Sequence, residues 1–311
     1  MRILHSNWIR TVIAVTISLL LLFLLFYKID ACKVFSIICT SNLKLILLAA
    51  AISLSVNIFL GVIKWRRILA ALGCSLPFKE ALAVYSGCLP LRVVFPMKSN
   101  ELFKAFYLQR QKGFPFLRGF SSIILDKTLN LLVILCIFLI GLSLVEVKFP
   151  KVLPIVASLV LIALLFSTPL RSMVIRLARA IHPRLHRFTE QLLSGFADIS
   201  TKEKIILTGY SVIFQFSEFI NTYILLRAVG VWVPFAMVLV FIPLIVIINN
   251  LPITMLGLGT REALIIFLFA KYGQSTSLLS ASLLVSFIEY ILPVLFGIFF
   301  IKSFLPVLPT H

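Results

Sequence analysis

The stretch "NNLPITMLGLGTREALIIFLF", residues 249–269, interrupts an apolar run with residues that a membrane helix tolerates poorly. Pro252 cannot donate a backbone hydrogen bond, and Gly257 and Gly259 allow the chain to turn without a side-chain clash. Irregular backbone at membrane depth is tolerated only where protein or a water-filled cavity covers it. The stretch therefore predicts a broken, re-entrant helix that is enclosed by other membrane helices.

A second half-helix is expected to begin at Thr260, directly before Arg261 and Glu262. Thr is a good N-cap residue, and a glutamate in the first turn interacts favourably with the helix dipole. Free backbone N–H groups at a helix start attract an anion, and Arg261 adds a full positive charge. We therefore expect phosphate binding here, with membrane lipids as the most available source. Glu262 would pair with a basic residue or carry a proton.

The composition is typical of an all-α integral membrane protein. Of 311 residues, 61% are hydrophobic and only 13% are charged, whereas soluble domains carry about 25% charged residues. The net charge is +18, from 29 Lys and Arg against 11 Asp and Glu. Because the basic residues lie between apolar runs, they indicate anionic lipid head groups as partners and not nucleic acid. The five cysteines have no metal-ligand spacing, so no metal and no cofactor are expected.

Hydropathy predicts a polytopic helical bundle of about seven to eight spans with two re-entrant, broken-helix elements. About 20 apolar residues, each rising about 1.5 Å, cross the hydrocarbon core of a bilayer. The expected spans are 11–27, 45–63, 119–145, 152–168, 205–226, 231–251 and 277–301. The two re-entrant elements are 81–96, which contains two prolines, and 249–270.

The distribution of basic residues predicts a multi-pass protein with a cytoplasmic N-terminus. In that orientation nineteen Lys and Arg residues lie on the cytoplasmic side and six on the other side, in agreement with the positive-inside rule. Ten of the nineteen lie in the segment 64–118 and seven in the loop 169–204. That loop is either a basic amphipathic segment on the anionic inner leaflet or an ordinary positively charged loop.

The two re-entrant elements are similar to each other. "CLPLRVVFPMKSNELFKAFYL" (88–108) and "NLPITMLGLGTREALIIFLF" (250–269) each start at a Leu-Pro pair and end in a helix that begins with hydroxyl–any–Glu. Broken helices at corresponding positions of two repeats point to the binding site of a transporter. The alternative is simply two capped helices that follow two loops.

We expect a single transmembrane domain over residues 1–311. Its repeat halves would be 1–145 and 205–311. The span 152–168 and the basic cytoplasmic loop 169–204 would join the two halves.

The candidate site residues form two groups. The lipid phosphate-binding group is Arg261, Thr260, Gly257, Gly259, Lys98 and Ser99. The group of polar cavity residues, with a role in proton coupling, is Glu262, Glu101, Glu218, Glu289, Asn249 and Asn250. A charge at the centre of a bilayer costs roughly 2.5–3.5 kcal/mol, so such residues usually face partners or a cavity. For Glu218 and Glu289 a functional role and a packing ion pair both remain open, whereas Asp126 and Lys127 are expected to form packing ion pairs.

Four segments carry a resemblance to a known family. They are "KWRRILAALG" (64–73), "PLRVVFPMKSNELFKAFYLQRQ" (90–111), "SSIILDKTLNLL" (121–132) and the stretch 249–269, which a glycine loop at Gly273 follows. With these features the chain resembles the transmembrane region of lysylphosphatidylglycerol synthases, also called the flippase-like family. Members of that family usually have Gly where this chain has Asn100. They also usually have Glu-Arg and a later Asp, where it has Asp126, Lys127 and Asn130.

The resemblance implies a lipid-translocating membrane part without the soluble synthase domain, in the plasma membrane of a bacterium or archaeon. We therefore expect a translocase that moves an anionic phospholipid or a polyprenyl-phosphate-linked lipid between leaflets, and not an enzyme, since no catalytic motif is present. One alternative is a membrane glycosyltransferase that uses a polyprenyl-phosphate sugar. Another is a non-catalytic partner of a lipid-synthesising enzyme.

Overall fold

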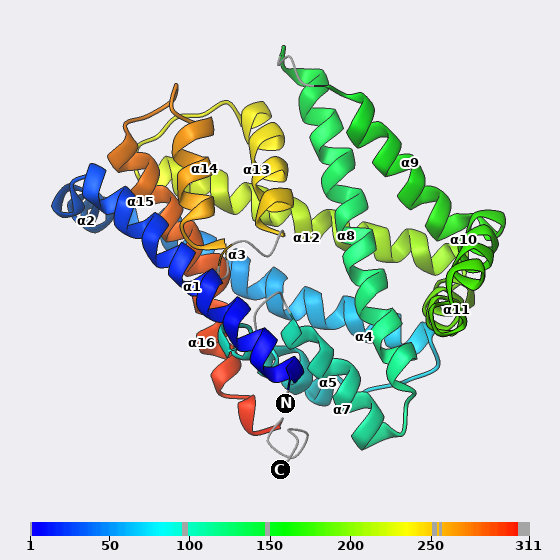
Figure 1. Cartoon of the computed structure of the whole chain (residues 1–311). Helices are drawn as coiled ribbons and strands as arrows, with labels where there is room; N and C mark the ends of the chain where they lie inside the picture. The colour runs from blue at the N-terminus through cyan, green and yellow to red at the C-terminus, as the bar shows by residue number, and fades with distance from the viewer. Residues whose placement is uncertain (1, 95–98, 147–149, 251–253, 255–256, 304–311) are drawn as a thin grey trace.

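All regular structure in the chain is helical (Figure 1), as the sequence predicts. The computed structural model describes residues 2–94, 99–146, 150–250, 254 and 257–303, and contains no β-strand among them. The first half contains α1 (Arg2–Lys28), α2 (Ala31–Thr40), α3 (Leu43–Ser53), the π-helical turn η1 (Leu54–Leu60), α4 (Gly61–Ala71), α5 (Phe78–Gly87), α6 (Leu91–Val94), the 3₁₀ turn η2 (Ser99–Glu101), α7 (Leu102–Lys112) and α8 (Phe116–Leu144). The second half contains α9 (Val152–Phe166), α10 (Thr168–Ile181), α11 (Pro183–Asp198), α12 (Thr201–Ala228), α13 (Phe235–Asn249), α14 (Thr260–Leu268), α15 (Ser275–Ser286), the π-helical turn η4 (Phe287–Ile291), α16 (Leu292–Ile298) and the 3₁₀ turn η5 (Ile301–Ser303).

Three helices are long and apolar enough to cross a membrane on their own, among the residues that the structure describes. They are the continuous helix Leu43–Ala71, α8, and the continuous helix Ser275–Ile298. The number is five when each of two sharply bent helix pairs counts as one span. The 28-residue α12 and the 15-residue apolar α13 occupy two more of the expected segments. A polytopic membrane bundle is therefore confirmed. The three to five candidate spans among the described residues are loosely consistent with the expected seven to eight.

The expected spans 11–27 and 152–168 correspond to α1 and α9, and each of these helices is followed by a sharp bend that hydropathy does not predict. The helix pair α1 and α2 bends by 89°, and the pair α9 and α10 bends by 94°. At the first bend the Asp30 carboxylate accepts hydrogen bonds from the backbone N–H groups of Cys32 and Lys33, at 3.0 and 3.2 Å. At the second bend the Ser167 hydroxyl accepts a hydrogen bond from the N–H of Leu170 at 3.4 Å. Each cap satisfies the start of a new helix, so the chain can change direction there.

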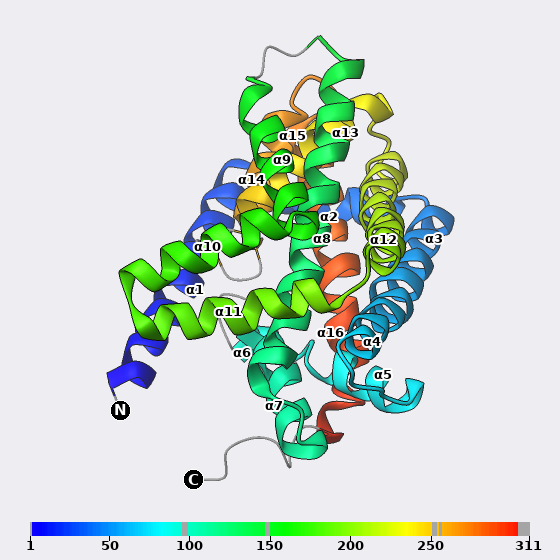
Figure 2. The ribbon, with the colours of Figure 1, turned by 90° about the vertical axis from the view of Figure 1, so that its right-hand side faces the viewer.

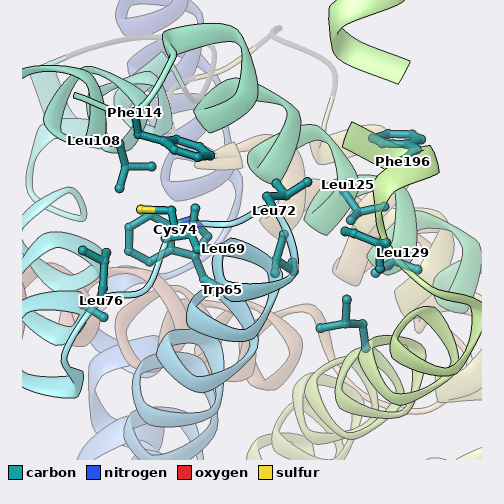
Figure 3. Packing of buried hydrophobic residues seen from close by; sticks show 14 of the residues in the cluster. Trp65, Leu69, Leu72, Cys74, Leu76, Leu108, Phe114, Leu125, Leu129 and Phe196 are labelled. Atoms are coloured by element: carbon teal, nitrogen blue, oxygen red, sulfur yellow. The ribbon is translucent and has the colours of Figure 1, made fainter. Parts of the chain in front are cut away.

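One buried hydrophobic cluster joins α4, α5, α7, α8, α11 and the start of α12 (Figure 3). Trp65 lies at its centre with 2% of its surface exposed, and its indole N–H donates a hydrogen bond to Ser122 Oγ at 3.3 Å. The cluster attaches the first broken element, α5 to α7, to the long helix α8. The members labelled in Figure 3 include Leu108, Leu125 and Phe196.

A second buried cluster positions the other broken element. It joins α3, α8, α12, α13, α14 and α15 around Phe219 and Phe269, both of which are fully buried. Phe269, directly after α14, contacts Phe241 of α13 edge to face, with ring centroids 5.2 Å apart. The two helices that flank the second break are therefore fixed against each other by aromatic packing.

The basic loop 169–204 forms a helical hairpin, α10 and α11, that crosses the direction of α8 (Figure 2). Ser121 of α8 donates a hydrogen bond to the carbonyl oxygen of Leu192 at 2.8 Å, and a Cβ at Gly195 would overlap the Ser121 hydroxyl. Large apolar side chains on the hairpin remain exposed: Met173, Leu177, Ile181, Leu185 and Phe188. The predicted amphipathic segment is thus confirmed as two helices, while its position on the inner leaflet stays a prediction.

Candidate functional site

The break before α14 depends on two glycines in the left-handed backbone region. Gly257 has φ of +76° and Gly259 has φ of +85°, a region that residues with a side chain rarely adopt. A Cβ on Gly259 would lie 2.7 Å from Cβ of Leu21, because α1 packs directly against this turn. The predicted turn at these glycines is therefore present. Pro252, which was predicted to end the preceding half-helix, lies outside the described residues.

Glu262 caps its own helix and is completely buried. Its Oε2 atom accepts a hydrogen bond from the backbone N–H of Gly259 at 2.5 Å, and its Oε1 atom accepts one from the Ser286 hydroxyl at 2.5 Å. The carboxylate thus compensates part of the positive end of the α14 dipole. It also connects α14 to α15.

Arg261, the residue before it, is 3% exposed and faces the same serine. Its Nη1 atom donates a hydrogen bond to Ser286 Oγ at 2.7 Å, so one hydroxyl bridges Arg261 and Glu262. Its guanidinium carbon lies 3.8 Å from the centre of the Tyr290 ring. Stacking on an aromatic face leaves the edges of a guanidinium plane available for hydrogen bonds and fixes its orientation.

Three more predicted residues lie around this turn. The Thr260 hydroxyl makes a hydrogen bond of 2.8 Å with the Thr254 hydroxyl. Asn249 ends α13, and its Oδ1 atom has no hydrogen-bond partner among the residues that the structure describes. A Cβ on Gly257 would lie 3.1 Å from Arg261 Nη2 and 3.3 Å from Asn249 Oδ1. Arg261 and Asn249 therefore converge on Gly257, and Asn250 is the C-cap of α13 beside them.

At the first broken element Glu101 ends the turn η2 and contacts two lysines. Its Oε1 atom lies 2.5 Å from Lys127 Nζ, and its Oε2 atom lies 3.6 Å from Lys104 Nζ. Asn100, where the similar family usually has Gly, is buried and donates a hydrogen bond to the carbonyl oxygen of Cys88 at 3.0 Å. Of the two predicted phosphate ligands here, Lys98 lies outside the described residues, and Ser99 is placed only as part of the turn η2.

Asp126 and Lys127, which were predicted to form packing ion pairs, have different partners. Asp126 Oδ1 lies 2.7 Å from Nζ of Lys64, which is 2% exposed and also donates a hydrogen bond to Asn130 Oδ1 at 2.6 Å. Lys127 contacts Glu101 instead. Both charges of the acid-base pair on α8 therefore connect to other helices, as packing charges do. Sequence reasoning missed Lys64, although a lysine at the end of an apolar run is a signal for it.

Together these residues form a cluster of five charges, which we call the lysine cluster: Lys64, Lys104, Lys127, Glu101 and Asp126. It contains three lysines and two carboxylates. Lys104 Nζ also lies 4.1 Å from the centre of the Tyr85 ring and 5.5 Å from that of Trp65. The Lys127 side chain remains 48% exposed, in contrast to that of Lys64. The cluster therefore presents an exposed cation and one more positive than negative charge.

The first broken element contacts the C-terminal segment of the chain, which also supports Arg261. Arg92 of α6 lies close enough to act electrostatically on both Glu101 and Tyr290. The last helix, α16, packs against α5, and a Cβ on Gly297 would overlap the carbonyl oxygen of Ser86. These contacts link α5 and α6 of the first broken element to η4 and α16, and η4 carries the Tyr290 ring on which Arg261 stacks. The hypothesis that Glu101 and Glu262 line one cavity, in matching places of a repeat, stays a prediction.

Glu289 lies in the π-helical turn η4 and is 6% exposed. Its Oε1 atom accepts a hydrogen bond from Asn221 Nδ2 at 2.5 Å, and its Oε2 atom accepts one from Asn57 Nδ2 at 2.6 Å and one from Ser53 Oγ at 3.4 Å. Glu218, one helical turn before Asn221, lies within electrostatic range of Glu289. Sequence reasoning missed Ser53 and Asn57, although an asparagine inside an apolar span is itself a signal.

Beyond these clusters the structure contains a basic pocket of about 280 Å³ where α4 meets α12. Its lining includes Arg66, Arg67 and Tyr210. Arg67 contacts both carboxylate oxygens of Glu203, at 2.8 and 3.1 Å, and this hydrogen bonding lowers the pKa of Glu203. Among the described residues no three His, Cys, Asp or Glu side chains gather at one point to bind a metal ion.

Comparison with known proteins identifies the family. No individual curated protein matches the chain. The model of the family described as "Lysylphosphatidylglycerol synthase TM region" matches residues 11–297, which include both broken elements, the lysine cluster and Glu289. Such a family indicates a lipid-related function in a membrane. The chain therefore belongs to the family of the lysylphosphatidylglycerol synthase transmembrane region.

Proposed function

We propose that the protein moves an anionic lipid, either a phospholipid or a polyprenyl-phosphate-linked lipid, between the two leaflets of a prokaryotic plasma membrane. The observation that carries this proposal is the excess positive charge of the lysine cluster. Three lysines face two carboxylates there, and Lys127 is 48% exposed. Membership of a lipid-related membrane family also supports this proposal.

The depth of the cluster explains why an anion would bind. Lys127 lies eight residues, or about 12 Å, beyond residue 119, where the expected span begins. Lys127 is paired with Glu101, but the three lysines and two carboxylates of the cluster leave one positive charge unbalanced, and such a charge at membrane depth is costly unless a partner or a cavity faces it. A lipid phosphate supplies the missing negative charge while its acyl chains remain in the hydrocarbon. The lipid phosphate then neutralises the excess positive charge at a membrane depth that an anion dissolved in water reaches less easily than a lipid head group does.

The turn before α14 would provide the second set of phosphate ligands. Arg261 is oriented by Ser286 and Tyr290, and a guanidinium offers two parallel donors to phosphate oxygens. Thr260, Gly257 and Gly259 surround it at the start of α14, and Lys98 and Ser99 would contribute from the first element. Transfer of the phosphate between the lysine cluster and Arg261, through a region that Arg92 also faces, would move the head group across the bundle.

The hairpin α10–α11 would gather the substrate. With the N-terminus in the cytoplasm, its basic residues lie at the inner leaflet, where each Lys or Arg gains about 1 kcal/mol from anionic lipid. A lipid-synthesising enzyme in the same membrane would supply the lipid.

The experiment is a translocation assay in liposomes that contain the purified protein. Head-group-labelled phospholipids, one anionic and one zwitterionic with the same acyl chains, are placed in one leaflet, and their loss from it is followed over time. The expected result is faster movement of the anionic lipid than of the zwitterionic lipid, with neither moving in protein-free liposomes. Equal rates for both lipids would contradict selection by phosphate charge, and no movement of either would contradict translocation itself.

A further inference from the structure

Glu289 is a buried carboxylate that only neutral groups contact. Asn221 and Asn57 donate hydrogen bonds to its two oxygens, and the Ser53 hydroxyl lies 3.4 Å from Oε2. No Lys, Arg or His lies within ion-pair distance of it among the residues that the structure describes. Glu101 and Glu262 differ from it, because Glu101 contacts two lysines and Glu262 caps a helix. Of these three carboxylates, Glu289 is thus the one held only by neutral side chains, with neither a lysine nor a helix N-terminus as its partner.

The charged and titratable groups around Glu289 come from four elements. Glu218 of α12 lies near it, and its negative charge opposes a second one. Tyr290 is the next residue in η4, and Arg261 of α14 and Arg92 of α6 lie on the side of that ring. The segments α3 and η1 contribute only Ser53 and Asn57, which do not titrate at ordinary pH. The buried Glu289 carboxylate therefore lies near the half-buried Glu218 carboxylate, and binding of a proton to Glu289 removes a costly buried charge.

The hydrogen bonds favour a proton over a metal cation. Asn57 Nδ2 donates to Ser53 Oγ at 2.9 Å as well as to Glu289, so its nitrogen is fixed toward the carboxylate. A hard cation such as Na⁺ would require oxygen ligands at that position. Asn221 is different, because it is 1% exposed and its Oδ1 atom has no partner among the described residues. Rotation of this one amide replaces an N–H donor to the carboxylate by an oxygen that accepts the hydrogen of a carboxylic acid.

The backbone around Glu289 provides a means of coupling. Glu289 lies in the π-helical turn η4, and Asn57 lies in a second π-helical turn, η1, of a helix that packs beside it. Single π-helical turns inside α-helices are frequent at functional sites, since their extra residue can change the register of the helix. The turn η4 also carries Tyr290, on which Arg261 stacks. A change in the register of η4 would therefore move the support of Arg261.

We propose that Glu289, together with Asn221 and Asn57, is a proton-binding site that couples a transmembrane proton gradient to lipid movement. This inference rests on the proposed function, since the coupled process is lipid translocation. On the side of higher proton concentration Glu289 takes up a proton and the Asn221 amide rotates. On the other side the carboxyl group releases the proton, and Asn221 again donates to the carboxylate. The change in protonation alters the register of η4, which moves Tyr290 and the Arg261 guanidinium stacked on it.

Two measurements test the inference separately from translocation as such. Infrared spectroscopy of the protein in liposomes follows the carbonyl band of a protonated carboxylic acid as a function of pH. The expected result is that one titrating component of this band is present in the wild type and missing in Glu289→Gln, while the other carboxylates still contribute; Glu146→Gln, which changes an exposed carboxylate, is the control that retains the component. In Asn221→Leu, which removes one donor to the carboxylate, the band should persist to higher pH. An identical spectrum for wild type and Glu289→Gln at every pH would overturn the inference.

The second measurement is lipid movement with and without an imposed pH gradient. The wild type and Glu146→Gln should respond to the gradient, and Glu289→Gln should lose the response. If Glu289→Gln does not fold, Asn221→Leu should show the altered response instead. A wild type that moves lipid at a rate independent of the pH gradient, or that responds only to a sodium gradient, refutes the proton site but leaves the proposed function intact. A wild type that moves no lipid while the infrared band still titrates refutes the proposed function instead.

Discussion

The guanidinium of Arg261 stacks on Tyr290 at 3.8 Å, while Ser286 bridges Arg261 to Glu262. The Arg261 guanidinium, the positive charge of the second broken element, is therefore oriented by the Tyr290 ring and the Ser286 hydroxyl. Both contacts fix the orientation of a guanidinium that is 3% exposed. The arrangement resembles that of an arginine that is positioned to meet a planar or tetrahedral anion.

Substitutions of Arg261 are expected to impair lipid translocation in a graded order. Arg261→Lys keeps the charge but loses the planar fork and the stacking on Tyr290, so transport should be reduced. Arg261→Gln loses the charge, so transport should be nearly abolished, with folding and membrane insertion retained in both variants. The measurement is the liposome assay with anionic lipid, combined with thermal unfolding in detergent.

A purely structural role of Arg261 leads to a different pattern. Arg261→Gln would then lower expression and thermal stability, and the double variant Arg261→Gln, Glu262→Gln would restore both. A folded Arg261→Gln protein that moves lipid at the normal rate would exclude phosphate binding at this residue.

The contact between α8 and α13 is expected to be sensitive to one methyl group. A Cβ on Gly141 would lie 2.7 Å from the carbonyl oxygen of Leu239, which is backbone and cannot move aside easily. Gly141→Ala should therefore lower the free energy of unfolding by about 1–3 kcal/mol, as overpacking does. Gly209→Ala is the matched control, because nothing lies within 4 Å of a Cβ on Gly209. Equal thermal unfolding of the two variants in detergent would contradict the packing of α8 against α13.

The orientation of the chain can be checked with cysteines. Cys32 and Cys39 are exposed on α2 and are predicted to lie outside the cell. A membrane-impermeant thiol reagent should label them in intact cells. Gln191→Cys, in the exposed part of α11 and in a background without Cys32 and Cys39, should be labelled only after the cells are opened. Labelling of Gln191→Cys from outside would reverse the orientation.

The hairpin α10–α11 is expected to lie on the membrane surface with its apolar side in lipid. Ile181 is 69% exposed, and an amphipathic helix at an interface buries such a residue among the acyl chains. The fluorescence of a tryptophan introduced as Ile181→Trp should be quenched by brominated lipids, in a background in which the native tryptophans are replaced. Gln191→Trp should be quenched much less. Equal quenching would indicate that the hairpin does not insert one side into the bilayer.

The sequence predicts the all-helical architecture and both broken elements because these depend on local properties. Runs of apolar residues determine the helices, and glycines at 257 and 259 mark the turn that the structure contains. The bends at Asp30 and Ser167 depend on local caps as well. Hydropathy averages over many residues, however, and therefore does not register a cap that one side chain forms.

The ion-pair and hydrogen-bond partners of the charged residues are harder to predict from the sequence than the helices and turns are. Lys64 and Asp126 are 62 positions apart, and Asn57 and Glu289 are separated by 232. Such contacts depend on the packing of distant helices and leave no periodic pattern in the chain. The hydropathy pattern does not indicate the π-helical turns η1 and η4 either, since each results from one extra residue within a continuous helix.

The most direct test of the central proposal is the rate of anionic lipid movement in liposomes that contain Lys127→Gln. This change removes one of three lysines that face two carboxylates, and Lys127 is the exposed one. Lys271→Gln, which removes an exposed lysine elsewhere, serves as the control, and Lys127→Arg keeps the charge. The expected result is loss of the preference for anionic over zwitterionic lipid in Lys127→Gln, with the preference retained in the other two variants. A folded Lys127→Gln protein with the wild-type rate and the wild-type preference would contradict the role of the lysine cluster in lipid translocation.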